Sequence, residues 1–80
     1  MENGIMLMRE YGHIEICLRE LMDAQNLTRT HVARLINARY EVVNKWYQGN
    51  VDRIDADILA RLCFVLKCSA ADIIRYVPET

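Results

Sequence analysis

Apolar residues recur at intervals of three and four along the chain, which is the spacing of one face of an α-helix. Leu18, Leu21 and Met22 follow this spacing and predict a helix over about residues 17–25. Asn26, the residue that follows this predicted helix, tolerates the left-handed backbone conformation that ends many helices. We therefore expect a first helix that closes at Asn26.

Three polar residues indicate where further helices begin. Each carries a side-chain oxygen suited to capping a helix, and each has one apolar residue directly before it and another four residues after it. These residues are Thr28, Asp55 and Ser69. They predict helices that begin at about 29, 56 and 70, and the first of these is expected to end near residue 36.

A further helix is predicted over about residues 40–48, where Val43 and Trp46 fall on one face and Gly49 follows as a helix-ending glycine. Only three residues separate it from the helix over 29–36. Such a short connection suits two short helices that cross steeply. Five helices in a compact all-α domain are therefore expected.

The residue types around this connection fit a steep crossing. Val32 and Ile36 are expected to face inward, and Ala33 is small at the place where the second helix must approach closely. Asn37 can adopt a positive φ at the turn. The pair of helices is thus expected to bury one side and to leave the opposite face of the helix over 40–48 free.

The beginning of the chain has a different pattern. Residues 5–8 are apolar without helical spacing, residues 14–16 alternate, and a Tyr-Gly pair lies between the two stretches. We expect a short N-terminal extended arm or hairpin over 1–16, followed by the helical domain over 17–80. The apolar stretch at 5–8 either covers the core or forms a strand at a dimer interface.

The composition supports a single helical domain. A chain of 80 residues closes only one hydrophobic core, and three glycines and one proline are too few for many short strands. No apolar run is long enough to span a bilayer, and the first residues lack the basic segment of a signal peptide. We therefore expect a cytoplasmic protein with no membrane partner.

The cysteines and histidines do not suggest a metal site. Cys17, Cys63 and Cys68 form no CxxC pair, and neither His13 nor His31 supplies the spacing of a zinc ligand. We interpret the three thiols as reduced, small hydrophobic groups of the core. No metal and no other cofactor is expected.

Charge is distributed unevenly along the chain. The formal net charge is −1, but residues 28–53 contain five basic and two acidic residues, a local balance of +3, so the remainder sums to −4. The five basic residues are Arg29, Arg34, Arg39, Lys45 and Arg53. Positive charge confined to one segment is typical of a protein that presents one face to phosphates.

These features together resemble the Cro/CI-type (XRE-like, lambda-repressor-like) helix-turn-helix family over residues 18–77. The residues that carry the resemblance are Leu27, Thr28, Val32, Ala33, Ile36, Asn37 and Ala38, then Val43, Trp46 and Gly49, and finally Arg53, Ile54, Asp55, Leu59, Leu62, Cys63 and Leu66. Each motif alone is weak, whereas their order and spacing together are specific. The resemblance implies a compact five-helix domain that binds DNA.

Some positions depart from the family pattern. Asn37 stands where the family usually has glycine, and Arg39 replaces the usual serine or threonine and offers no oxygen for capping. The start of the helix over 40–48 is therefore expected to be looser. Tyr40 and Glu41 replace the short polar residues that are frequent there, so the target sequence of other members does not transfer.

The resemblance implies a sequence-specific transcriptional regulator, a repressor, that binds double-stranded DNA as a homodimer. The helix over 40–48 would lie in the major groove, and the helix before it would cross the DNA backbone. The residues expected to contact bases are Tyr40, Glu41, Asn44 and Lys45. The residues expected to contact phosphates are Thr28, Arg29, Arg39, Asn50 and Arg53.

Two of these assignments have alternatives. Tyr40 contacts a base or the sugar-phosphate backbone, or it is simply an exposed aromatic residue. Glu41 repels phosphates, yet a carboxylate can accept a hydrogen bond from N4 of cytosine in the major groove.

A second class of function is a protein-binding helical module, such as an antitoxin or adaptor of the same fold, which the acidic total charge and Glu41 favour. An enzyme is not expected, because the sequence has no glycine-rich phosphate loop, no nucleophile elbow and no paired carboxylates. No small-molecule ligand is indicated either. The salt dependence of binding distinguishes a DNA-binding protein from a protein-binding module, since affinity that depends on several phosphate contacts falls steeply as the salt concentration rises.

Overall fold

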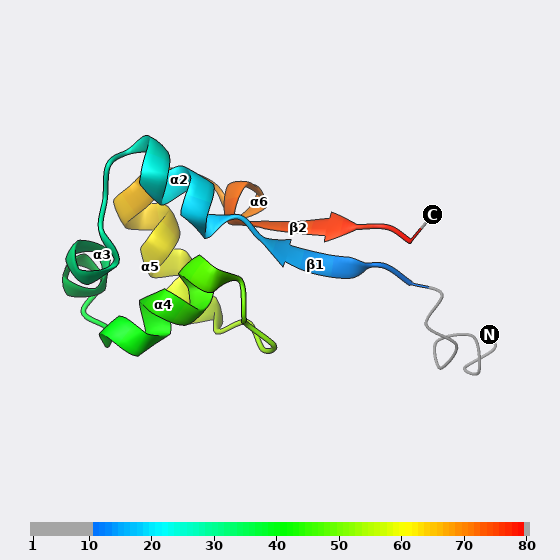
Figure 1. Cartoon of the computed structure of the whole chain (residues 1–80), viewed down its shortest axis with the longest axis horizontal. Coiled ribbons are helices and arrows are strands. Elements are labelled where there is room, and N and C mark those ends of the chain that lie inside the picture. Colours follow the sequence, from blue (N-terminus) through cyan, green and yellow to red (C-terminus); the bar gives the residue numbers. More distant parts are fainter. Residues whose placement is uncertain (1–10, 80) are drawn as a thin grey trace.

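Helices form the body of the molecule, and a pair of short strands extends from it (Figure 1). The computed structural model describes residues 11–79. In chain order the elements are β1 (His13–Ile16), α2 (Leu18–Ala24), α3 (Arg29–Leu35), α4 (Tyr40–Gln48), α5 (Ala56–Leu66), α6 (Ala70–Ile73) and β2 (Ile74–Val77). The five predicted helices are thus present, and none in the described part is long and apolar enough to cross a membrane.

Every helix contributes to one hydrophobic core. The buried apolar residues are Leu18, Met22, Val32, Ala33, Ile36, Val43, Trp46, Leu62, Leu66 and Ile73. They recur at helical spacing, so each helix turns one stripe inward. The predicted inward positions around the turn between α3 and α4 are confirmed, and so is the burial of Val43 and Trp46 on α4.

The predicted helix caps are confirmed by their hydrogen bonds. Thr28 Oγ1 accepts from the backbone N–H of His31 over 3.1 Å. Asp55 Oδ1 accepts from the backbone N–H groups of the second and third residues after it, over 2.9 and 3.3 Å. At the start of α6, Asp72 Oδ2 accepts from the backbone N–H of Ser69 over 3.0 Å. Each cap satisfies a backbone group that a helix end leaves unpaired.

The turns after three helices contain the expected left-handed residues. The φ angles are +58° at Asn26, +56° at Asn37 and +79° at Gly49. Lys67, after α5, also has a positive φ of +57°, which the sequence did not indicate because lysine has no particular preference for this conformation.

The strand β1 lies at the end of the segment predicted to be an extended arm or hairpin, but the sequence did not indicate its partner. It pairs with β2 at the opposite end of the described chain, antiparallel, with Ile14 opposite Tyr76 and Ile16 opposite Ile74. The last helix is only one turn long, because the segment after it alternates and is rich in residues that favour strands. The all-α prediction therefore holds for the body of the domain, to which a two-stranded antiparallel sheet is added. Residues 5–8, the other stretch of the predicted hairpin, lie outside the described residues.

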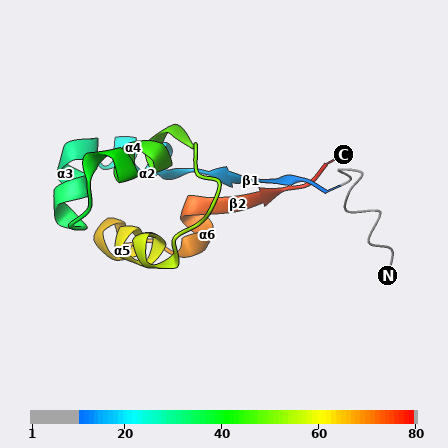
Figure 2. The same ribbon diagram turned by 90° about the horizontal axis from the view of Figure 1, so that it is seen from below.

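The two strands project from the helices as a ribbon, here called the β1–β2 ribbon (Figure 2). An exposed ion pair joins Arg75 Nη2 to Glu15 Oε1 over 2.6 Å on one face of the ribbon. The hydrogen bond from Arg75 holds the pKa of the Glu15 carboxyl below its ordinary value. Gly12 packs so closely that a Cβ atom there would lie 1.8 Å from the carbonyl oxygen of Val77. Only glycine fits this approach.

Candidate nucleic-acid interface

The helices α3 and α4 meet through a tight turn of four residues (Figure 1). The backbone N–H of Ala38 donates to the carbonyl oxygen of Ala33 over 2.9 Å, and the side chain of Ala33 is buried. Arg61 Nη1 on the neighbouring helix α5 donates to the carbonyl oxygen of Ile36 over 2.9 Å. A small buried side chain thus allows the turn to be tight, and a hydrogen bond from an arginine stabilises its backbone.

The buried stripe of α4 decides which of its residues are available to a partner. Val43 and Trp46 are buried. Of the four residues predicted to contact bases, Tyr40, Glu41 and Lys45 are exposed and Asn44 is half-buried. No side-chain hydrogen bond caps α4 at Arg39, as expected from the missing oxygen.

Asn44 is half-buried because Arg29 on α3 binds it. Arg29 Nη1 donates to Asn44 Oδ1 over 2.8 Å. Since a guanidinium only donates, this contact fixes the orientation of the amide and turns its two N–H donors away from Arg29. The structure therefore joins two residues that the sequence analysis assigned to different kinds of contact, one to bases and one to phosphates.

Tyr47 extends this contact into a cluster that the sequence analysis did not identify. The guanidinium carbon of Arg29 lies 4.6 Å from the centre of the Tyr47 ring, and that of Arg19 on α2 lies 4.9 Å from it. The Tyr47 hydroxyl donates to Asp23 Oδ1 over 3.0 Å. Two cations thus lie against one ring, a favourable arrangement because the face of an aromatic ring is electron-rich.

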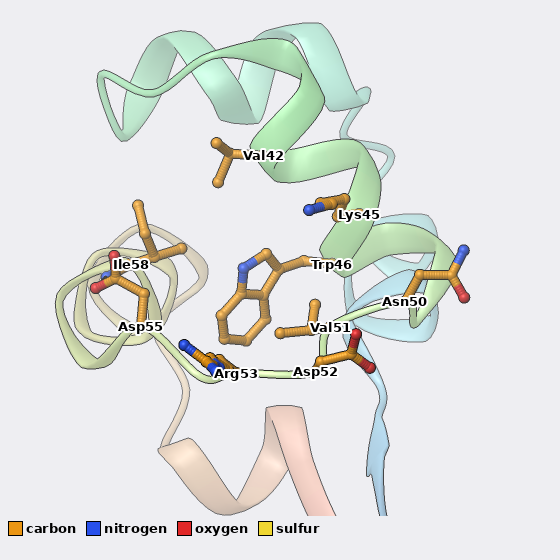
Figure 3. Close-up of a pocket in the computed structure, with 9 residues that line it drawn as sticks. All are labelled: Val42, Lys45, Trp46, Asn50, Val51, Asp52, Arg53, Asp55 and Ile58. Carbon is orange, nitrogen blue, oxygen red and sulfur yellow. The ribbon is translucent and has the colours of Figure 1, made fainter.

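A cavity of about 520 Å³ lies on the other side of α4, between this helix, the loop after it and α5 (Figure 3). Its apolar walls come from Val42, Trp46, Val51 and Ile58, and its polar lining from Lys45, Asn50, Asp52, Arg53 and Asp55. The cavity thus brings together Lys45, which we predicted to contact a base, with Asn50 and Arg53, which we predicted to contact phosphates.

The remaining predicted phosphate contacts lie near the two helix starts. Thr28 caps α3, but its hydroxyl proton is not used by that hydrogen bond and remains able to donate. Arg39 is the exposed residue directly before α4. The predicted phosphate contacts thus lie at the starts of α3 and α4 and in the loop after α4.

The basic residues of this region are not neutralised by carboxylates. Within residues 11–79 the ion pairs are those of Arg61 with Asp57 and of Arg75 with Glu15. Both lie outside the basic segment over 28–53. The positive charge of that segment is consequently open to an external partner.

No group of three or more histidine, cysteine or acidic residues in the described part of the chain is arranged to hold a metal ion. Cys17, Cys63 and Cys68 are half-buried free thiols. Burial, with the neighbouring thiol of Cys63, raises the pKa of Cys68.

Two short helices joined by a tight turn, the second with one exposed face, form the arrangement of a helix-turn-helix motif. A family model described as the Cro/C1-type HTH DNA-binding domain matches residues 17–79. The chain therefore belongs to this family, as the resemblance in its sequence implied.

Solved structures show the same fold at low sequence identity. A protein from Bacteroides fragilis to which DNA binding is attributed superimposes with a TM-score of 0.70 at 11% identity, over 79% of this chain and 100% of that one. The transcriptional regulator VanUg superimposes with a TM-score of 0.65 at 18% identity, over 85% of this chain and 91% of that one. Among curated proteins no match is found.

Proposed function

We propose that this protein is a sequence-specific DNA-binding transcription regulator, a repressor, that places α4 in the major groove. The observation that carries the proposal is the exposed face of α4, which is free of ion pairs within residues 11–79 and has basic residues on both sides. An α-helix fits the major groove of B-DNA, where base edges differ in their donors and acceptors. Family membership and the regulator fold of VanUg support the same function.

The residues proposed to read bases are Tyr40, Glu41 and Asn44, with Lys45 at the edge of the same face. The amide donors of Asn44 point away from Arg29, because Arg29 binds its oxygen. Base acceptors in the major groove, such as N7 and O6 of guanine or O4 of thymine, are its natural partners. Glu41 has only acceptor oxygens, so it is suited to the N4 donor of cytosine.

The residues proposed to contact phosphates are Thr28, Arg29, Arg39, Asn50 and Arg53. They flank the exposed face of α4 at its start and in the loop after it. Such contacts fix the position of a protein on the duplex without reading its sequence. Arg29 combines this role with orienting Asn44, so it influences affinity and specificity together.

One short helix reads few base pairs, so we propose that the protein binds as a homodimer. A two-fold pair doubles the site and places the half-sites about 34 Å apart, one turn of the duplex. The DNA site would then be a palindrome.

Selection of bound duplexes from a random DNA pool tests the function. The expected result is one enriched motif, with two symmetric halves. A Glu41→Gln variant, selected in parallel, is expected to change the motif, whereas Glu79→Gln, far from α4 in the chain, leaves it unchanged. A parent protein that enriches no motif would contradict the proposal.

A second candidate function is protein binding, favoured by an exposed apolar surface formed by the end of α3 and by α5. Phe64 is 84% exposed and Leu35 is 50% exposed, and both line the same shallow grooves. Large apolar residues left exposed together often mark a protein interface. If the random pool yields no motif, co-purification of a partner by the parent but not by a Phe64→Ser variant would establish this function instead.

A further inference from the structure

Trp46 has an unused hydrogen-bond donor. Its side chain is only 4% exposed, yet no described residue accepts a hydrogen bond from its indole N–H. No described side-chain nitrogen or oxygen is both sealed from solvent and unpaired, so the indole nitrogen keeps some exposure, and Trp46 lines the cavity. Figure 3 shows the ring among the other lining residues, with its nitrogen on the side of Val42 and Lys45 and its six-membered ring on the side of Arg53.

Two cations border the same cavity. Lys45 and Arg53 both line it, and neither forms an ion pair within residues 11–79. The lining also contains two acidic residues, Asp52 and Asp55. The carboxylate of Asp55 accepts the backbone N–H groups at the start of α5, and Figure 3 shows the carboxylate of Asp52 directed away from the Trp46 ring. An indole N–H, an ammonium and a guanidinium are all donors, and a cavity lined by these three groups suits an anionic acceptor.

The cavity adjoins the face proposed to bind DNA, because Lys45 belongs to both. We propose that this cavity receives one sugar-phosphate unit of the DNA strand that runs beside α4. A phosphate oxygen accepts from Trp46 Nε1, Lys45 and Arg53 contribute charge, and the deoxyribose packs on the apolar wall of Val42 and Ile58. The volume of about 520 Å³ exceeds that of a lone phosphate and leaves room for the sugar.

This inference rests on the proposed function and changes one assignment within it. Lys45 becomes a phosphate contact, whereas the sequence favoured a base contact. Trp46 gains a role besides packing, so a residue of the core takes part directly in DNA binding.

Nuclear magnetic resonance of the ¹⁵N-labelled protein tests the hydrogen bond without any substitution. Trp46 is the only tryptophan, so the spectrum contains a single indole N–H signal. Phosphate contacts do not depend on sequence, so any duplex of about 20 base pairs, two helical turns, serves at low salt. The expected result is a downfield shift of the indole proton and slower exchange with water.

Each other outcome overturns the inference in an identifiable way. If the backbone signals of α4 move and the indole signal does not, the cavity is empty in the complex although the proposed function stands. If no signal moves, the inference and the proposed function fail together. If inorganic phosphate alone produces the same saturable shift, the cavity is a site for free anions rather than for DNA.

Variants give a second test. Trp46→Phe retains a large aromatic ring but removes the donor, and we expect about a tenfold loss of duplex affinity, the loss typical of a hydrogen bond to a charged group. Lys45→Ala and Arg53→Ala should each weaken all sequences alike and lower the salt dependence of binding by about one ion. Arg75→Gln, which removes a positive charge from the β1–β2 ribbon, is the matched control.

The Arg75→Gln control shows whether the loss of duplex affinity is specific to residues of the cavity. Unchanged binding by Arg75→Gln supports the cavity as the site of the lost contacts. An equal loss in all the charge variants would mean that only net charge matters and would overturn the inference. Altered base preference in Lys45→Ala would return this residue to base contact and contradict its place in the cavity. If the Trp46→Phe variant does not fold, the nuclear magnetic resonance signal of the indole N–H in the parent protein tests the inference instead.

Discussion

The β1–β2 ribbon and the α3–α4 pair use charge in opposite ways. On the ribbon, Arg75 is matched by Glu15 across the strands. On the α3–α4 pair and the loop after it, the basic residues meet aromatic rings, an amide oxygen or solvent, with no ion pair inside residues 11–79. The basic residues of the α3–α4 region are thus positioned by contacts that leave their charge positive, so this charge remains available to polyanions.

The same contrast appears in the packing. The α3–α4 pair is anchored by residues that are almost fully buried, such as Val43 and Trp46. Beyond the core, the ribbon exposes Ile14 and Tyr76, each by more than half. Substitutions in the two regions are therefore expected to differ strongly in their effect on stability.

Trp46→Ala is expected to have the largest effect. Removing a buried large aromatic side chain costs about 3–5 kcal/mol, a large part of the stability of a small domain. Tyr76→Ala on the ribbon should cost much less, because that side chain is 56% exposed. Chemical denaturation of both variants measures the difference. Equal stability of Trp46→Ala and the parent would show that α4 is not anchored by this residue.

Arg29→Ala should impair DNA binding by about 1–3 kcal/mol, the range for a specific contact, and relax the preference at the base that Asn44 reads. The reason is that Asn44 loses the donor that orients its amide. Asn44→Ala should then add little to Arg29→Ala, which binding of the double variant measures. Arg34→Ala, on the same helix, is the control. Fully additive losses would show that the two residues act independently.

Gly12→Ala should disturb the ribbon and spare DNA binding. The new Cβ would lie 1.8 Å from the carbonyl oxygen of Val77, so the strands must separate, at a cost of about 1–3 kcal/mol. Gly49→Ala meets no atom within 4 Å, so its cost of about 1 kcal/mol comes from the positive φ alone. Thermal unfolding ranks the two variants. A more harmful Gly49→Ala would contradict the close packing at Gly12.

The smallest effect concerns the exposed pair of Glu15 and Arg75. Because the pKa of Glu15 is lowered in the folded state, its contribution to stability is present above the ordinary carboxyl pKa and is lost as the pH falls through the lowered value. Glu15→Gln should therefore slightly lower the melting temperature at neutral pH and have no effect in strong acid. Melting curves across this pH range provide the check, and a difference that grows toward acid would have the wrong sign.

The local features of the fold could be predicted from the sequence, whereas contacts between distant residues could not. The caps at Thr28 and Asp55 involve backbone groups within a few residues, and the turn at Asn37 involves the φ angle of that residue itself. These features therefore follow from residue type. The pairing of β1 with β2 joins segments about 60 residues apart in the chain. Nothing in a short alternating stretch specifies its partner.

The candidate site shows the same division. The exposure of Tyr40, Glu41 and Lys45 follows from the helical position of the buried Val43 and Trp46. The contacts of Arg29 with Asn44 and Tyr47 depend on the crossing of two helices, so spacing along the chain does not reveal them. For the same reason Arg61 gave no sign that it closes the turn between α3 and α4.

The salt dependence of duplex binding tests the central claim most directly. If the unpaired basic residues of the α3–α4 pair bind phosphates, the logarithm of the association constant should fall linearly with the logarithm of the salt concentration, with a slope of about −0.9 for each phosphate contact. Four cationic residues are proposed to contact phosphates, namely Arg29, Arg39, Lys45 and Arg53, so a slope of about −3.6 per protomer is expected. A slope near zero, with binding retained at high salt, would contradict the account.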